Sequence, residues 1–104
     1  MLYLMMDKKS DCRLVKVGYS DGVKNIKTRR KSYYSYNPFA IMRSSCAGST
    51  AMERECRQLL TEWGGKRIAG TEWFVVSECL FNELYNQGMK KFGIKTQIHF
   101  LEEF

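Results

Sequence analysis

The chain has few residues of the kinds that build metal centres and no cysteine motif. It contains one histidine, His99, and four cysteines with no Cys-x-x-Cys pair among them. The cysteines are Cys12, Cys46, Cys56 and Cys79. A zinc site would have to gather its four ligands from distant segments, so the sequence argues against one. It favours reduced, mostly buried thiols in a cytosolic protein.

Long hydrophobic runs are also missing. No apolar segment approaches the roughly 20 residues that a membrane-spanning helix needs. The apolar start, Met1–Met6, has no basic segment before it and meets Asp7 at once, which is unlike a signal peptide. We therefore expect no membrane segment.

Positive charge is present in excess but is unevenly distributed. The net charge of the 104 residues is +6. Residues 1–43 hold ten cations and three acids, a net of +7, whereas residues 44–104 hold seven cations and eight acids, a net of −1. A basic half suggests a polyanionic partner, and a merely solvated basic face is the alternative. The length predicts a single domain, residues 1–104.

The first half of the chain predicts a hairpin, a helix and a strand. Leu2–Met6 and Cys12–Gly18 are short and β-compatible, and the polar residues between them predict a hairpin. A helix is expected over Val23–Tyr34, which the Asn-Pro pair that follows would end. Phe39–Met42 then predicts a third strand, running out near Gly48.

The second half predicts two helices separated by an extended segment. Ser49 or Thr50 caps a helix with apolar residues at helical spacing, and a Gly-Gly pair at 64–65 stops it. Glu72–Val76 is extended, and Ser77 opens the last helix. From Met89 onward the pattern is ambiguous. The expected fold class is α/β (α+β), with a small, mainly antiparallel three-stranded sheet flanked by helices.

Five short motifs occur in a recognisable order over residues 1–80. They are Leu2-Tyr3, Lys16-Val17-Gly18-Tyr19-Ser20, Arg29, Met52-Glu53-x-x-Cys56 and Glu72-Trp73-Phe74. Together they resemble the GIY-YIG nuclease superfamily, and more narrowly its compact phage and bacterial branch with a Lys-Ile-Gly second motif. The sequence departs from the superfamily pattern at Met1, where the first motif has glycine. It departs again at Lys16, where the second motif has tyrosine.

The resemblance implies metal-dependent hydrolysis of nucleic-acid phosphodiester bonds with Mg²⁺ or Mn²⁺. The catalytic residues that it implies are Tyr3, Lys16, Tyr19, Arg29 and Glu53, with Glu53 as the metal ligand. Hydrolysis needs a proton acceptor and positive charge around the phosphate. A phenol with a pKa near about 10 is a poor base unless cations stabilise its phenolate, and Lys16 and Arg29 could do so for Tyr3. Tyr19 is the candidate to replace the tyrosine of the second motif.

Two of these assignments have close competitors. Arg29 has Ile26 three residues before it and Tyr33 four after, as the superfamily pattern requires, and this phase favours Arg29 over Arg30. Glu53 lies beside the apolar stripe of its helix, whereas Glu55 is turned toward solvent, so Glu53 is favoured for the metal. Glu53 could instead complement the helix dipole. We expect the catalytic side chains to share one concave surface.

Beyond the second motif, a run of basic residues is followed by tyrosines, and nucleic-acid-binding grooves contain such mixtures of basic and aromatic residues. The predicted nucleic-acid contacts are Lys24, Lys27, Arg30, Lys31, Tyr34 and Tyr36. Trp73 and Phe74 are expected in the core. Glu72 could hold the catalytic residues in place without contacting the substrate, but no role is assigned to it.

Three functions remain open. The first is a small endonuclease that acts on DNA rather than RNA. The second is an inactive nucleic-acid-binding adaptor or regulator on the same scaffold, and the third is a module whose basic face binds an acidic protein. The sequence shows no separate DNA-targeting domain, so either the specificity is low or a homodimer or a separate targeting partner supplies it. The expected location is the cytoplasm, which is the host cytoplasm if the chain is phage-encoded.

Overall fold

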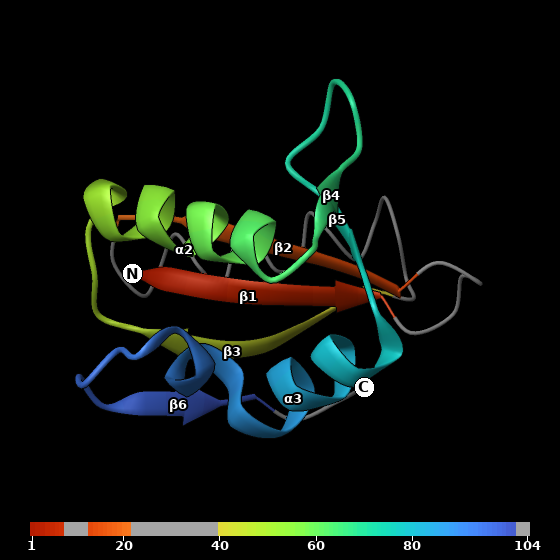
Figure 1. Ribbon diagram of the computed structural model, residues 1–104. Helices are drawn as coiled ribbons and strands as arrows, with labels where there is room; N and C mark the ends of the chain where they lie inside the picture. The colour runs from red at the N-terminus through yellow and green to blue at the C-terminus, as the bar shows by residue number, and fades with distance from the viewer. Residues whose placement is uncertain (8–12, 22–39, 102–104) are drawn as a thin grey trace.

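The computed structural model describes residues 1–7, 13–21 and 40–101, and its centre is an antiparallel sheet (Figure 1). Its strands are β1 (Leu2–Asp7), β2 (Arg13–Tyr19), β3 (Ala40–Cys46), β4 (Lys66–Arg67), β5 (Phe74–Val76) and β6 (Ile98–Phe100). Their spatial order is β4-β5-β2-β1-β3-β6, and every neighbouring pair is antiparallel. β1 therefore lies inside the sheet with β2 on one side and β3 on the other.

The apolar run of β1 is explained by burial on both faces of the sheet. Leu2, Leu4 and Met6 are buried in the main core, while Tyr3 and Met5 are buried in a second cluster. Because successive side chains of a strand point to opposite faces, these two sets mark the two faces of the sheet. The main core carries most of the buried aliphatic side chains, and the second cluster adds Ala40 and Met42.

Two α-helices and a 3₁₀ helix cover the main-core face. α2 (Thr50–Glu62) contributes Cys56 and Leu60, and α3 (Glu78–Gln87) contributes Leu80, Phe81 and Leu84. The 3₁₀ helix η1 (Gly88–Phe92) follows directly and lies beside β3 and β6 (Figure 1). No helix in the described part of the chain is long and apolar enough to cross a membrane.

Serine caps set the helix starts, as the sequence predicted, and a glycine ends α3. The Ser49 hydroxyl accepts a hydrogen bond from the Met52 amide at the start of α2, and Ser77 caps α3 in the same way. Gly88 ends α3 with a φ of +58°, a backbone conformation that favours glycine.

The α+β class, the antiparallel β1–β2 hairpin, β3, α2, β5 and α3 all agree with the sequence prediction. The predicted sheet size is wrong, because the sheet has six strands and not three. Three strands are added: β5, which the sequence predicted as extended but did not count in the sheet, and the edge strands β4 and β6. β4 and β6 are only two and three residues long, too short for an alternating pattern to indicate them. The helix predicted over Val23–Tyr34 lies outside the described residues.

Candidate functional site

The tyrosine of the first motif lies directly over the glycine of the second. Tyr3 is paired with Gly18 across the β1–β2 ladder, and only 1% of its surface is exposed. A Cβ atom at position 18 would come within 2.3 Å of both Cζ and Oη of Tyr3. Glycine is therefore required here by the space that the end of the phenol ring occupies, and the two motifs form one packing unit.

Lys16 lies on the same face of the sheet as Tyr3. It is paired with Met5, two residues along β1 from Tyr3, so Lys16 and Tyr3 are diagonal neighbours on that face. The side chain of Lys16 is only 11% exposed, and its Nζ lies 3.4 Å from Oε2 of Glu72. The amine is thus fixed near the point where β5 stops pairing with β2, since that pairing ends at Val15.

Glu72 connects Lys16 to helix α2. A terminal nitrogen of the Arg57 guanidinium lies 2.9 Å from Oε1 of Glu72, and it is also 2.9 Å from Oε1 of Glu53. The result is a continuous series of ion pairs, Lys16–Glu72–Arg57–Glu53, which we call the edge network. Two cations and two carboxylates balance in it, so the network is neutral.

Glu53 is better placed than Glu55 to take part in a site. Its side chain is 17% exposed and bound to Arg57 one helical turn later, whereas Glu55 is exposed. Glu53 also lies in the first turn of α2, where a carboxylate is stabilised by the helix dipole. Both interpretations of Glu53 from the sequence, a ligand and a dipole partner, therefore fit its position.

The structure does not bring Tyr3 and Glu53 onto one face of the sheet. Tyr3 belongs to the second cluster, while α2 packs on the main-core face. The edge network joins the two faces instead, because Lys16 comes from the face of Tyr3 and Glu53 comes from α2. The prediction of a single concave surface is wrong, and the separation of Tyr3 from Glu53 weighs against the two acting in one site.

Tyr19 lies apart from Tyr3 and Lys16. It is paired with Leu2 and packs against the main core, so it lies on the opposite face of β2 from Lys16. A hydrogen bond to Asp21, together with the negative charge of that residue, raises the pKa of Tyr19. A phenolate is therefore harder to form here, which weighs against Tyr19 as the proton acceptor.

The predicted basic helix lies outside the described residues. This applies to one predicted catalytic residue, Arg29, and to all the predicted nucleic-acid contacts. Those contacts are Lys24, Lys27, Arg30, Lys31, Tyr34 and Tyr36.

Sequence reasoning missed Arg57 and gave Glu72 no role. Both are central to the edge network. A signal for Arg57 was present, because it follows Glu53 by four residues, the spacing at which helical ion pairs form. Glu72 carried no such signal, since its partners Lys16 and Arg57 are distant in the chain. Trp73 and Phe74 pack against the second cluster and in the main core, as expected.

Two of the three cysteines that the structure describes are buried. Cys46 and Cys56 are free and buried, and Cys79 is free and exposed. Burial raises the pKa of Cys56 to about 12, with further contributions from the charges of Cys46, Glu55 and Glu53. Among the residues that the structure describes, no group of three or more His, Cys, Asp or Glu could hold a metal ion.

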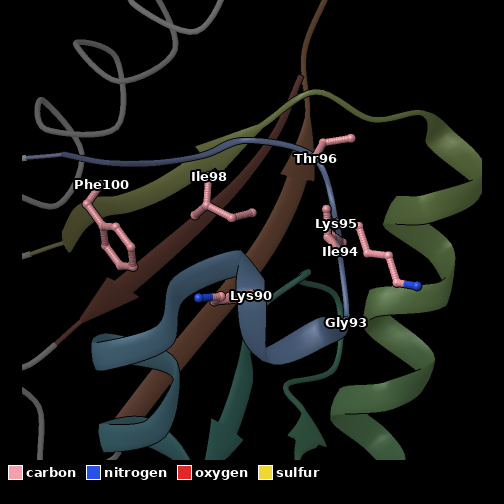
Figure 2. A pocket seen from close by; sticks show the side chains of 7 residues that line it. All are labelled: Lys90, Gly93, Ile94, Lys95, Thr96, Ile98 and Phe100. Carbon is pink, nitrogen blue, oxygen red and sulfur yellow. The ribbon is translucent and has the colours of Figure 1, made fainter.

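A separate hollow of about 640 Å³ lies between η1 and β6 (Figure 2). Its lining mixes apolar and basic side chains, namely Lys90, Gly93, Ile94, Lys95, Thr96, Ile98 and Phe100. None of the residues that the sequence predicted for catalysis or nucleic-acid binding lines it. The edge network and this hollow are thus different sites.

Comparison with known families identifies the domain. Residues 1–88 match the T5orf172 domain, and the chain belongs to this family. The T5orf172 domain is a phage-associated domain related to nuclease-like, GIY-YIG-like folds. No curated protein and no solved structure matches the chain.

Proposed function

We propose that this protein is a small divalent-metal-dependent endonuclease that hydrolyses DNA phosphodiester bonds by chemistry of the GIY-YIG type. The observation that carries the proposal is the edge network. Lys16 and Glu53 were assigned to catalysis from motifs 37 positions apart, and ion pairs through Glu72 and Arg57 link them. The match to the T5orf172 domain, which is related to nuclease-like folds, also supports a nuclease function.

Glu53 fits a magnesium ion of the kind that proteins hold through few carboxylates. Mg²⁺ usually keeps several waters and takes one or two carboxylates together with phosphate oxygens from the substrate. Arg57 binds Oε1 of Glu53, and the carboxylate has a second oxygen, Oε2, that a metal ion could use. When bound, the ion would supply positive charge to the phosphate and make a bound water more acidic.

The cations of the edge network have a second task in this proposal. Arg57 and Lys16 neutralise Glu53 and Glu72. If Glu53 is given to a metal ion, the guanidinium becomes available to a phosphate oxygen, with which it can form charge-assisted hydrogen bonds. Lys16 would also stabilise a phenolate at Tyr3, its diagonal neighbour, and so favour proton transfer to that residue.

The burial of Tyr3 favours a second candidate, an inactive nucleic-acid-binding adaptor. With 1% of its surface exposed, the phenol is packed as a core residue would be. An adaptor needs the basic charge of the chain but neither the phenol nor the glutamate. The two candidates therefore differ in what they predict for Tyr3 and Glu53.

Nicking of supercoiled plasmid in the presence of Mg²⁺ or Mn²⁺ tests the proposal. Glu53→Ala should abolish cutting and leave DNA binding intact, and Glu55→Ala on the exposed side of the same helix is the matched control. Tyr3→Phe should keep the fold and binding and lower the rate about 10²–10⁴-fold. Arg29→Ala should lose both binding and cutting, since charge-assisted phosphate contacts act in ground and transition states.

Two results would count against the enzyme. Equal cutting by wild type, Glu53→Ala and Glu55→Ala would show the metal assignment to be wrong. Binding without cutting in every variant, with no response to Tyr3→Phe, would identify the adaptor.

A further inference from the structure

The hairpin formed by β4 and β5 stands out from the body of the protein. Figure 1 shows the connection between the two strands projecting beyond the sheet and helices. Lys66 is paired with Val75 and Arg67 with Phe74, and residues 66–70 are all exposed. We call residues 66–71 the arm. An exposed projection of this kind adds nothing to the core, so its shape calls for another explanation.

The arm is held in one conformation by its own hydrogen bonds. The Ile68 amide donates to the Trp73 carbonyl at 2.9 Å, and the Thr71 amide donates to the Ile68 carbonyl at 3.1 Å. Nε of Arg67 donates to the Thr71 carbonyl at 2.7 Å. Gly70 has a φ of +78°, which allows the turn at the tip. An arm fixed in this way loses little conformational entropy when it binds.

The chemistry of the arm is cationic with an apolar tip. Residues 63–71 include no Asp or Glu, and within residues 1–7, 13–21 and 40–101 no ion pair involves Lys66 or Arg67. Ile68 is 38% exposed and is one of two large hydrophobic side chains that are exposed in the described residues. Cations beside an exposed branched aliphatic side chain are the combination that proteins insert into the minor groove of DNA.

The last residue of the arm is adjacent in the chain to a member of the edge network. Glu72, which binds Lys16 and Arg57, directly follows Thr71 in the chain. We propose that the arm enters a groove of duplex DNA beside the edge network, with Lys66 and Arg67 on the phosphates and Ile68 in the groove. This inference rests on the proposed function and names the form of its substrate, a duplex.

A single strand fits the arm less well than a duplex. Single strands are held by a basic groove together with aromatic side chains on which their bases stack. The exposed arm has no aromatic residue, and Trp73 at its base packs against the second cluster. The rigid shape and the pair of cations instead suit a surface with regularly spaced phosphates.

The test compares arm variants with a matched pair of lysines on the other side of the molecule. Lys66→Ala/Arg67→Ala removes two charges from the arm, and Lys90→Ala/Lys95→Ala removes two charges from the rim of the hollow in Figure 2. Binding to a fluorescent duplex and to one of its single strands is measured by anisotropy over a range of salt concentrations. Thermal melting confirms that each variant is folded.

The arm double variant should weaken duplex binding and reduce the salt dependence by about 0.9 for each phosphate that it no longer neutralises. Ile68→Ser should weaken duplex binding with no change in salt dependence, because it removes no charge. Both should affect the single strand less than the duplex, and the Lys90/Lys95 variant should affect both DNAs less than the arm variant does.

Three results would overturn the inference while leaving the proposed function standing. They are unchanged duplex binding by the arm variants, an equal weakening in the Lys90/Lys95 variant, and an equal weakening on the single strand. A wild type that neither binds nor cuts DNA would overturn the proposed function itself. If the wild type binds DNA without cutting it, the arm experiment can still be interpreted, because the experiment measures binding.

Discussion

Arg57 and Arg43 lie toward opposite edges of the sheet, near β2 and in β3 respectively, and are held in opposite ways. On the β2 side, the guanidinium of Arg57 is shared between two carboxylates, Glu53 and Glu72. On the β3 side, Nε of Arg43 donates to the Tyr85 carbonyl at 2.8 Å, and its guanidinium carbon lies 4.1 Å from the Tyr85 ring centroid and 4.9 Å from that of Phe100. Within the described part of the chain, Arg43 forms no ion pair with a carboxylate.

The difference shows which side can exchange its ionic partners. Most charges of the edge network are largely buried, so they need partners, but a metal ion on Glu53 and a phosphate on Arg57 would replace one ionic partner by another. Arg43 has no such partner among the described residues. It is the extra residue of a β-bulge in β3, where the register with β1 shifts between Leu4 and Met5, and its side chain is packed on aromatic rings. We therefore expect ligand chemistry on the β2 side and a structural role for the β3 side.

The largest effect is expected from filling the space beneath Tyr3 on the β2 side. Gly18→Ala would place a Cβ atom 2.3 Å from Cζ and Oη of a side chain that is almost completely buried. We expect the free energy of unfolding to fall by about 3 kcal/mol, the upper end of the usual cost of overpacking. Urea denaturation measures it.

A double-mutant cycle shows whether the ring is the cause. Leucine at position 3 lacks the end of the ring, so Gly18→Ala should cost clearly less in a Tyr3→Leu background. An equal cost in both backgrounds would mean that the motif glycine serves the backbone of β2 and not the phenol.

The next largest effect is expected on the nicking rate when the carboxylate of Glu72 is neutralised, compared with neutralising that of Glu83. Glu72→Gln keeps the shape of the side chain but removes the charge that holds Lys16 and Arg57, so the nicking rate should fall about 10–100-fold, as for other residues that orient a metal site. Glu83→Gln is the control, because Glu83 pairs with Lys91 away from the edge network. Its nicking rate should stay within about twofold of wild type. A similar fall of the nicking rate in both variants would mean that ligand chemistry is not confined to the β2 side.

The sequence was most informative where local chemistry decides the structure. Ser49 and Ser77 mark the helix starts because a hydroxyl can cap only the amides next to it in the chain. Tyr3 and Gly18 were identified from the order of the motifs. The antiparallel pairing of β1 with β2 places the two residues opposite each other.

What the sequence could not predict depends on contacts between distant segments. The pairing of Glu72 with Lys16 spans 56 positions and results from where β5 stops pairing with β2. The expected common surface of Tyr3 and Glu53 failed for a similar reason. Strand alternation places Tyr3 on a face, but only the packing of α2 decides which face Glu53 approaches.

A smaller effect is expected from Arg43 on the β3 side. Arg43→Lys keeps the charge but removes the planar group that stacks on Tyr85 and Phe100 and bonds the Tyr85 carbonyl. Stability should fall by about 1–2 kcal/mol, the sum of a modest cation–π term and one hydrogen bond. Plasmid nicking and DNA binding at a temperature well below the melting point should not change. A fall in activity without a fall in stability would place function on the β3 side as well.

The smallest effect is expected from a change of pH close to 9, and it comes from the main core, where the two sides meet. Cys56 of α2 lies close enough to Cys46 of β3 for their charges to interact, and burial raises the pKa of Cys56 from its ordinary 9.0 to about 12. Above about pH 9 the unfolded chain releases this proton while the folded chain keeps it, so the free energy of unfolding falls as pH rises. The fall is limited to about 1.4 kcal/mol per pH unit for one proton. Urea denaturation of wild type and Cys56→Ala on both sides of about pH 9 measures the difference, since lysines and tyrosines titrate in both proteins. Wild type should lose more stability with rising pH than Cys56→Ala does, and parallel falls would mean that the Cys56 thiol ionises as readily in the folded core as in the unfolded chain.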